Sequence, residues 1–152
     1  HPRVSLRTPG IGVGGHCLPV DPWFLIGAAP DETALLRVAR GVNDAVPDRW
    51  VARIRAAAAG RPIGLLGLTY KADTDDLRAS PALAIARALS SGADVLAADP
   101  YVARVGGVRL GPVEDVLARP VVVLLVAHRA YLPLRPRIPA EATAIDACAG
   151  WP

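Results

Sequence analysis

The sequence contains no methionine, a single lysine, a single phenylalanine and only two cysteines. Two cysteines, Cys17 and Cys148, are too few for a disulfide framework, which excludes the small disulfide-rich secreted domains. The longest apolar run, residues 121–127, is far shorter than the roughly 20 residues of a membrane-spanning helix. We therefore expect no membrane contact, no signal peptide and a cytoplasmic location. Because methionine is absent from the start, we also expect the chain to begin inside a longer protein.

Strong charge of one sign is lacking too. The formal net charge is +3, and the basic residues are spread along the chain instead of being clustered among aromatic residues. This distribution does not favour a nucleic-acid-binding surface. An anionic small molecule needs only two or three of these cations, and Lys71, the single lysine, stands out among the arginines.

The second part of the chain shows an α/β pattern. Residues 63–68 form an apolar run of strand length, and Ser80 followed by Pro81 predicts the start of a helix that ends at Gly92. Further strands are predicted over residues 95–98, 121–126 and 143–145, with a short helix over residues 113–117. Strand, helix and strand in this order form a βαβ unit. We therefore predict an α/β fold, a small doubly wound parallel sheet of the Rossmann-like type.

A long helical arm is predicted over residues 31–58. Asp31 and Glu32 favour a helix start, and Gly60 marks the end. Pro47 interrupts the pattern, so we expect either a kink or two abutting helices, while Asn43 and Asp44 are predicted to face solvent. Periodicity alone leaves open whether the apolar stripe packs on its own domain or on a partner. The stripe consists of Leu35, Val38, Ala39, Val42 and Val46, followed by Trp50, Val51, Ile54 and Ala58.

A glycine-rich segment near the start of the chain precedes Cys17. Four glycines between positions 10 and 15 allow the backbone to approach a ligand closely, and their N–H groups are able to favour a thiolate. We interpret Cys17 as a nucleophile, with Asp21 orienting water or accepting a proton in a later step. The alternative is a buried structural cysteine.

The loop after the first predicted strand, residues 69–78, is polar and densely charged. Ligands bind beyond the carboxyl ends of strands in such sheets, so this loop is the expected site. It lacks the G-x-G-x-x-G turn of a dinucleotide site, which argues for a different nucleotide held by side chains, although Asp99 resembles a ribose-binding acid. For the three aspartates at positions 73, 75 and 76 we favour a turn salt-linked to a buried Arg78 over a metal site. A merely solvated loop is the other alternative.

Two long motifs carry a family resemblance. GVGGHCLPVDPWF at residues 12–24, preceded by HPRV at residues 1–4, and LGLTYKADTDDLRASP at residues 66–81 resemble the C-terminal half of UDP-sugar dehydrogenases, which oxidise the sugar C6 alcohol to a carboxylate. Within the family the resemblance is strongest to members that act on UDP-N-acetyl-D-mannosamine. It implies a catalytic-cysteine loop over residues 1–30, a linker and dimerisation helix over residues 31–60 and a UDP-sugar-binding domain over residues 61–152. The NAD-binding Rossmann domain of the family is absent from the chain.

The resemblance also implies roles for individual residues. Cys17 would form a thiohemiacetal and then a thioester, Asp21 would orient the hydrolytic water, and NAD would be the cofactor. His16 is expected to shape selectivity for N-acetylated sugars. We expect the active site to be shared in a homodimer and this chain alone to be inactive. The implied contacts are those of His1, Arg3, Gly14, Tyr70 and Lys71 with the UDP-sugar and of Arg78 with NAD across the cleft.

Several alternatives stay open from the sequence. The chain could belong to an enzyme that acts on UDP-N-acetylglucosamine or UDP-glucose, or it could be a non-catalytic nucleotide-sugar-binding module. A cysteine hydrolase would need His128 as the base for Cys17. Cys148 replaces a basic substrate-binding residue of the family, and we predict a buried structural thiol at this position.

Overall fold

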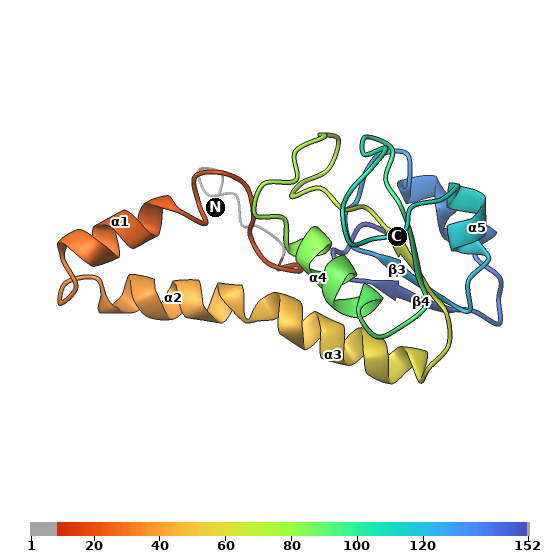
Figure 1. Cartoon of the computed structure of the whole chain (residues 1–152), viewed down its shortest axis with the longest axis horizontal. Coiled ribbons are helices and arrows are strands. Elements are labelled where there is room, and N and C mark those ends of the chain that lie inside the picture. Colours follow the sequence, from red (N-terminus) through yellow and green to blue (C-terminus); the bar gives the residue numbers. More distant parts are fainter. Residues whose placement is uncertain (1–8, 152) are drawn as a thin grey trace, which may run out of the picture.

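The computed structural model describes residues 9–151, and its chain runs from a helical arm into a parallel sheet (Figure 1). Among the described residues the elements follow one another as α1 (Asp21–Ala28), α2 (Ala34–Asp44), α3 (Val46–Ala58), β1 (Ile63–Leu66), α4 (Pro81–Ser90), β2 (Val95–Ala98), α5 (Val113–Leu117), β3 (Val121–Leu124), the 3₁₀ helix η1 (Leu132–Arg137) and β4 (Thr143–Asp146).

The sheet contains four parallel strands within the described residues, in the order β2-β1-β3-β4. Ile63 of β1 is in register with Val95 of β2 on one side and with Val121 of β3 on the other. Every residue of β1, β2 and β3 is buried, as expected for strands covered on both faces. The four strands that the sequence predicts are therefore confirmed. The order reverses between β1 and β3, the position at which such sheets bind ligands.

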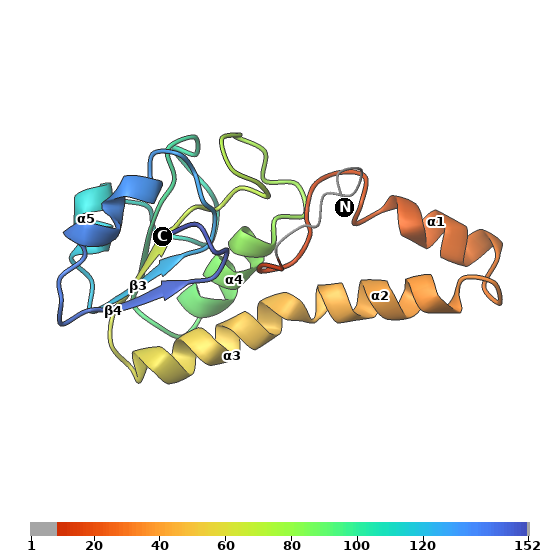
Figure 2. The same cartoon turned by 180° about the vertical axis from the view of Figure 1, so that it is seen from behind.

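Helices cover both faces of the sheet, which confirms the doubly wound architecture. On one face α3 packs against α4, and Ile54 and Ile85 are fully buried there together with Leu65 of β1. On the other face α5 packs on β1 and β2, and Val116 and Leu134 lie in a second apolar cluster with Leu66. Figure 2 shows α5 and η1 on the opposite side of the sheet from α3.

The predicted long helix is two abutting helices, α2 and α3, separated only by Ala45. Pro47 lies in the first turn of α3, where its missing N–H breaks no helical hydrogen bond. The helix begins at Ala34, later than the predicted start at Asp31. Thr33 occupies the N-terminal cap position without capping the helix, because its hydroxyl donates to the Ala29 carbonyl oxygen at 2.6 Å.

The apolar stripe of the two helices divides at their junction. Val51, Ile54 and Ala58 of α3 are buried in the sheet core, so this part packs on its own domain. On α2, by contrast, Leu35 is 82% exposed and Val38 is 62% exposed. The arm thus offers an apolar face that no other described residue covers.

Two elements differ from the sequence prediction. Helix α1 was expected to be part of a loop, yet Asp21 and Pro22 in its first turn are typical helix-start residues. The 3₁₀ helix η1 was not predicted, because Pro133 and Pro136 interrupt any longer helical pattern. Figure 1 shows the chain running outwards along α1 and returning along α2, as a hairpin that projects from the sheet domain. Among residues 9–151, no helix is both long and apolar enough to cross a membrane.

Candidate active site

Cys17 lies on the surface, in the turn that leads into α1. Its thiol is free and exposed, and its carbonyl oxygen accepts hydrogen bonds from the N–H groups of Val20 at 2.9 Å and Asp21 at 2.8 Å. Asp21 is also exposed, at the first position of the helix. The alternative of a buried structural Cys17 is therefore wrong, and both residues predicted to act on a ligand are accessible to one.

The glycine segment docks against the loop that follows β1. A Cβ atom on Gly14 would lie 2.5 Å from the Ala79 carbonyl oxygen, and one on Gly15 would lie 3.0 Å from the Tyr70 ring. The Gly15 N–H donates to the Arg78 carbonyl oxygen at 3.0 Å, while the Val13 N–H donates to Asn43 Oδ1 at 2.8 Å.

This docking corrects two expectations from the sequence. Gly14 and Gly15 permit close approach of the chain to itself, and the Gly15 N–H is engaged by the Arg78 carbonyl oxygen, so this N–H is not available to a thiolate. Asn43 was expected to be solvated, but its amide group bonds the backbone of the glycine segment.

The loop after β1 presents Tyr70 and Lys71. Its course is fixed by the Tyr70 N–H, which donates to the Asp76 carbonyl oxygen at 3.1 Å, and by the Thr69 hydroxyl, which donates to the Lys71 carbonyl oxygen at 2.9 Å. Lys71 is exposed, with its ammonium nitrogen 5.4 Å from the centre of the Tyr70 ring. A compact cation beside an aromatic face suits a nucleotide diphosphate.

Arg78 forms a two-pronged ion pair with Asp76. Its Nε lies 3.0 Å from both carboxylate oxygens and its terminal nitrogen lies 2.6 Å from Oδ2, an arrangement that lowers the pKa of Asp76 to about 2. The Arg78 side chain is 63% exposed, so the expectation of a buried arginine is wrong, although the salt link itself is present.

The aspartates of this loop point to different partners. Asp73 Oδ2 accepts from Arg129 Nε at 2.7 Å, which lowers the pKa of Asp73, whereas Asp76 faces Arg78. Among the described residues no group of three histidine, cysteine, aspartate or glutamate side chains is arranged to hold a metal ion. The loop is therefore built from separate ion pairs.

The carboxyl ends of β1, β2 and β3 are closed by a buried polar cluster. Asp99 has no exposed side-chain surface, and it accepts hydrogen bonds from the Leu68 N–H at 2.7 Å and the Tyr101 N–H at 2.9 Å. Burial raises the pKa of Asp99, but hydrogen bonds from the His128 ring and these N–H groups outweigh it, so the net shift is downward. The resemblance of Asp99 to a ribose-binding acid is thus wrong, because its oxygens are used inside the chain.

His128 lies at the centre of this cluster and is fully buried. It follows β3 and contacts residues after both β1 and β2, whereas the exposed Cys17 lies in the turn before α1. The structure records no contact between His128 and Cys17. A buried imidazole already bonded to backbone and carboxylate does not match the base that a cysteine hydrolase needs.

Cys148 is half-buried beside β4. Its Sγ donates to Asp146 Oδ1 at 3.6 Å and to the Leu124 carbonyl oxygen at 3.8 Å. Burial, reinforced by the Asp146 carboxylate, raises the pKa of the thiol to about 12. Cys148 therefore stays protonated at neutral pH and packs against the apolar cluster on the α5 face of the sheet.

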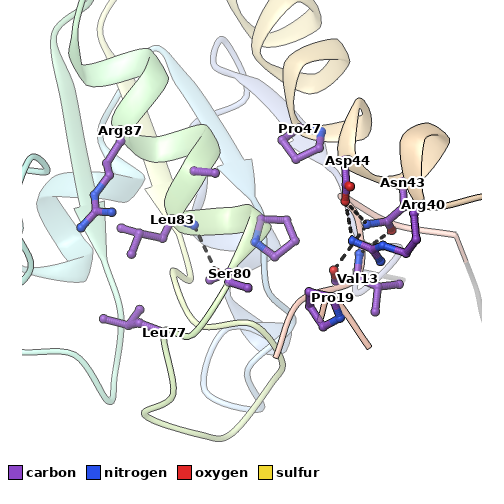
Figure 3. Close-up of a pocket in the computed structure, with 13 residues that line it drawn as sticks. Val13, Pro19, Arg40, Asn43, Asp44, Pro47, Leu77, Ser80, Leu83 and Arg87 are labelled. Atoms are coloured by element: carbon purple, nitrogen blue, oxygen red, sulfur yellow. Dashed lines mark hydrogen bonds and ion pairs between the residues drawn. The ribbon is translucent and has the colours of Figure 1, made fainter. Parts of the chain in front are cut away.

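A cavity of about 350 Å³ lies between the glycine segment, the α2–α3 junction and the start of α4. Figure 3 shows Arg40 paired with Asp44 on one wall, with Ser80 and Leu83 on the other. Cys17, Tyr70 and Lys71 do not line it. Of the predicted site residues, His1 and Arg3 lie outside the described residues.

Sequence reasoning had missed the contribution of Asn43 and had not connected His128 and Arg129 to the loop after β1. A usable signal exists for the last two, because both directly follow a predicted strand whose end meets the binding edge of a parallel sheet. Local sequence gives no comparable signal for Asn43, which contacts a segment thirty residues away.

Comparison with known protein families matches both the glycine segment and the sheet domain to one family. The profile "UDP-glucose/GDP-mannose dehydrogenase family, UDP binding domain" matches residues 64–148. The profile for the central domain of the same family matches residues 1–45. The two matches meet across the contact between the glycine segment and the loop after β1.

Individual relatives agree with these profiles. The chain is 45% identical over 141 residues to an NDP-N-acetyl-D-galactosaminuronic acid dehydrogenase from Ralstonia solanacearum, covering 86% of this chain and 33% of the relative. It is 35% identical over 170 residues to a UDP-N-acetyl-D-mannosamine dehydrogenase from Yersinia pestis, covering 99% of this chain and 40% of the relative.

A solved structure agrees as well. The UDP-D-ManNAc dehydrogenase from Pyrococcus horikoshii superposes with a TM-score of 0.82 at 32% identity, covering all of this chain and 38% of that one. The chain thus spans between a third and two fifths of the length of these proteins.

Proposed function

This chain belongs to the UDP-glucose/GDP-mannose dehydrogenase family, and from that premise we propose that it is the C-terminal part of an NAD-dependent, cytoplasmic dehydrogenase. The enzyme would oxidise the C6 alcohol of UDP-N-acetyl-D-mannosamine to the carboxylate. One observation carries the proposal: the segment with the exposed Cys17 is bonded through Gly15 to the loop that presents Tyr70 and Lys71. This bond supports a site in which Cys17 would act beside the residues that hold the nucleotide.

Lys71 and Tyr70 would hold the nucleotide. The ammonium group of Lys71 is exposed and has no carboxylate partner among residues 9–151, so its charge is available to a diphosphate. A hydrogen bond to a charged group contributes about 1.5–3 kcal/mol. Gly14, which we also expect near the substrate, lies against Tyr70 and Ala79 in this structure.

When bound, NAD would accept the hydride that leaves the sugar C6. The reversal point between β1 and β3 is filled by the buried Asp99 and His128 side chains, and the loop after β1 lacks the G-x-G-x-x-G turn of a dinucleotide site. The described residues therefore offer a contact for NAD, the exposed Arg78, but no complete NAD site. This fits a cofactor held mainly by another domain.

The chemistry of this chain would centre on Cys17. After a first hydride transfer from C6 to NAD has given the aldehyde, the Cys17 thiolate would add to its carbonyl carbon and the oxygen would take up a proton, which gives a thiohemiacetal. Transfer of a second hydride from C6 to NAD, with loss of the hydroxyl proton, would then give a thioester. Water then adds to the thioester carbonyl, the thiolate leaves, and the carboxylate is released with a proton. Asp21, exposed one turn beyond Cys17, would orient or deprotonate that water.

Relatives of this chain are named for different sugars. Relatives named for N-acetyl-D-galactosaminuronic acid and for UDP-N-acetyl-D-mannosamine match at 45% and 35% identity, so the galacto-configured sugar is a second candidate. The test mixes this chain with a separately produced NAD-binding half and NAD, then follows NADH absorbance. We expect NADH with UDP-N-acetylmannosamine. NADH only with UDP-N-acetylgalactosamine, UDP-N-acetylglucosamine or UDP-glucose would overturn the substrate choice.

A non-catalytic nucleotide-sugar-binding module is the alternative function. Calorimetric titration with UDP separates binding from catalysis: Lys71→Ala should weaken UDP binding about 10- to 100-fold. Arg37→Ala, an exposed cation on α2 away from this loop, is the matched control and should bind UDP like the wild type. Cys17→Ala should keep UDP binding and lose NADH formation in the mixed assay. If UDP does not bind the wild-type chain, the proposed function fails.

We further propose that the α2 face mediates homodimerisation with a shared active site. Support comes from Leu35, Val38 and Val42, which are spaced to share one side of the helix and are all more than half exposed. His1 and Arg3, expected to reach the neighbouring subunit, remain a prediction. Sedimentation of Leu35→Glu, which should dissociate the dimer, tests this interface.

A further inference from the structure

His128 is a fully buried titratable residue that the proposed mechanism does not use. It lies just beyond β3, at the reversal point of the strand order. Its ring contacts the segments that follow β1 and β2, and it packs between Tyr101, at a centroid distance of 5.3 Å, and Tyr131, at 5.6 Å. Three segments distant in sequence thus meet at one imidazole.

The hydrogen bonds around His128 define one tautomer. The backbone N–H of Asp73 donates to Nδ1 at 2.9 Å, so Nδ1 carries a lone pair and no proton. In the neutral ring Nε2 then carries the hydrogen, which points at Asp99 Oδ2, 3.2 Å away. Thr69 Oγ1 lies 3.3 Å from the same nitrogen. The carboxylate therefore selects the tautomer that leaves Nδ1 free to accept.

Asp99 is itself held rigidly. Its two oxygens accept from the N–H groups of Leu68 and Tyr101, so the carboxylate cannot turn away from the ring without breaking backbone bonds. A continuous chain of hydrogen bonds runs from the ends of β1 and β2 through Asp99 and His128 to Asp73 in the loop that carries Tyr70 and Lys71.

Asp73 needs such support. Its φ of +57° lies in the left-handed region, which is costly for a residue with a side chain unless the surroundings impose it. Its N–H is held by His128, and its carboxylate is held by the N–H of Arg129 at 3.0 Å and by Arg129 Nε at 2.7 Å. His128 and Arg129, two consecutive residues after β3, thus bond the backbone and the side chain of Asp73.

We propose that His128 is a positioning residue: held by Asp99 in its Nε2–H tautomer, it fixes Asp73 and thereby sets the course of residues 69–76, which present Tyr70 and Lys71 to the nucleotide. The proposal rests on the proposed function for the identity of the ligand. The positioning itself is a property of the loop that is measurable without any ligand.

Two variants separate the roles of the two ring nitrogens of His128. An asparagine at position 128 places an amide oxygen near the position of Nδ1 and retains an acceptor for Asp73. A glutamine places its amide group near Nε2, facing Asp99, and loses that acceptor. His128→Asn should therefore keep the loop in place, and His128→Gln should release it. Leu117→Ala removes buried packing on α5 but none of these hydrogen bonds, so it controls for a general loss of stability.

The first readout is amide NMR of the 152-residue chain without ligand. In the wild type, long-range ¹⁵N spectra should show a protonated Nε2 and an unprotonated Nδ1 on His128. The Asp73 amide should be protected from hydrogen exchange in the wild type, His128→Asn and Leu117→Ala. Protection should be lost in His128→Gln, with shifts of the Tyr70 and Lys71 signals. A protonated Nδ1, or unchanged Asp73 protection in His128→Gln, would overturn the proposal.

The second readout is UDP affinity by calorimetry. His128→Gln should bind UDP about 3- to 10-fold more weakly, the effect of one lost hydrogen bond, while His128→Asn and Leu117→Ala should match the wild type. Equal loss in all three variants would mean that His128 acts only through stability. If the wild-type chain binds no UDP, the proposed function fails, and the Asp73 protection data still decide whether His128 positions the loop.

Discussion

The backbone N–H of Gly15 donates to the carbonyl oxygen of Arg78 at 3.0 Å. Gly15 lies two residues before Cys17 in the sequence. This bond joins the two motifs by which the chain resembles its family. A shift of the loop after β1 would therefore strain or break its bond to the thiol-bearing segment.

Gly14→Ala should destabilise the protein and displace Cys17. The added methyl group would lie 2.5 Å from the Ala79 carbonyl oxygen and 2.7 Å from Pro81 Cδ, so the backbone must move. Overpacking of this kind costs about 1–3 kcal/mol, measurable by urea unfolding.

Gly41→Ala is the matched control for this substitution. Gly41 lies inside α2, and apart from its chain neighbours and the adjacent helix backbone no described atom would lie within 4 Å of its new Cβ atom. Alanine there should stabilise the helix by about 0.5–1 kcal/mol. Equal stability of both variants would contradict the tight docking of the glycine segment.

The two thiols should differ in reactivity. Burial and the nearby Asp146 raise the pKa of Cys148 to about 12, so its reactive thiolate is scarce at pH 8. Cys17 is exposed. We expect iodoacetamide at pH 8 to modify Cys17 alone in the folded chain, as read by peptide mass spectrometry. Both cysteines should react in urea, which controls for the reagent. Labelling of Cys148 in the folded chain at the rate of Cys17 would contradict the prediction.

The Asp76–Arg78 pair should contribute a pH-dependent part of the stability. The arginine lowers the pKa of Asp76 to about 2 in the folded chain, against an ordinary value of about 3.9. The contribution is therefore complete above about pH 3.9 and is lost as the pH falls towards 2. Carboxyl NMR titration should show a higher Asp76 pKa in Arg78→Ala and an intermediate one in Arg78→Lys. An unchanged pKa in Arg78→Ala would exclude this ion pair in solution.

Asp99→Ala should destabilise the sheet domain more than a substitution of a surface aspartate. It leaves the N–H groups of Leu68 and Tyr101 and the His128 ring without their acceptor, and an unsatisfied buried polar group costs about 1–3 kcal/mol. Asp94→Ala is the control, since Asp94 is half exposed in its pairs with Arg109 and Arg119 and should matter less. Thermal unfolding compares the two, and an equal loss would speak against the buried cluster.

Much of the sheet domain could be predicted from local sequence. Uninterrupted apolar runs indicate β1 and β3, and Ser80 with Pro81 indicates the start of α4, where the Ser80 hydroxyl does accept the Leu83 N–H at 3.2 Å. These signals work because each depends only on neighbouring residues. The loop of charged residues was also placed correctly at the carboxyl edge of the sheet.

The internal contacts of the candidate site could not be predicted in the same way. Glycine density indicates close approach but not the partner, which turned out to be Tyr70 and the backbone near Arg78. The sequence likewise shows Asp99 and His128 as separate polar residues, and only the strand order brings them together. Their hydrogen bonds use up the atoms that a ligand would otherwise have contacted.

The burial of α3 has a practical consequence for dissecting the protein. Val51, Ile54 and Ala58 supply one wall of the sheet core, and Arg55 donates to the Ala88 carbonyl oxygen on α4 at 2.7 Å. A truncation that starts at Arg61 would uncover that wall and invite aggregation. A fragment that contains only the sheet domain should instead start before Val46, so that it keeps α3, the helix that covers this face of the sheet.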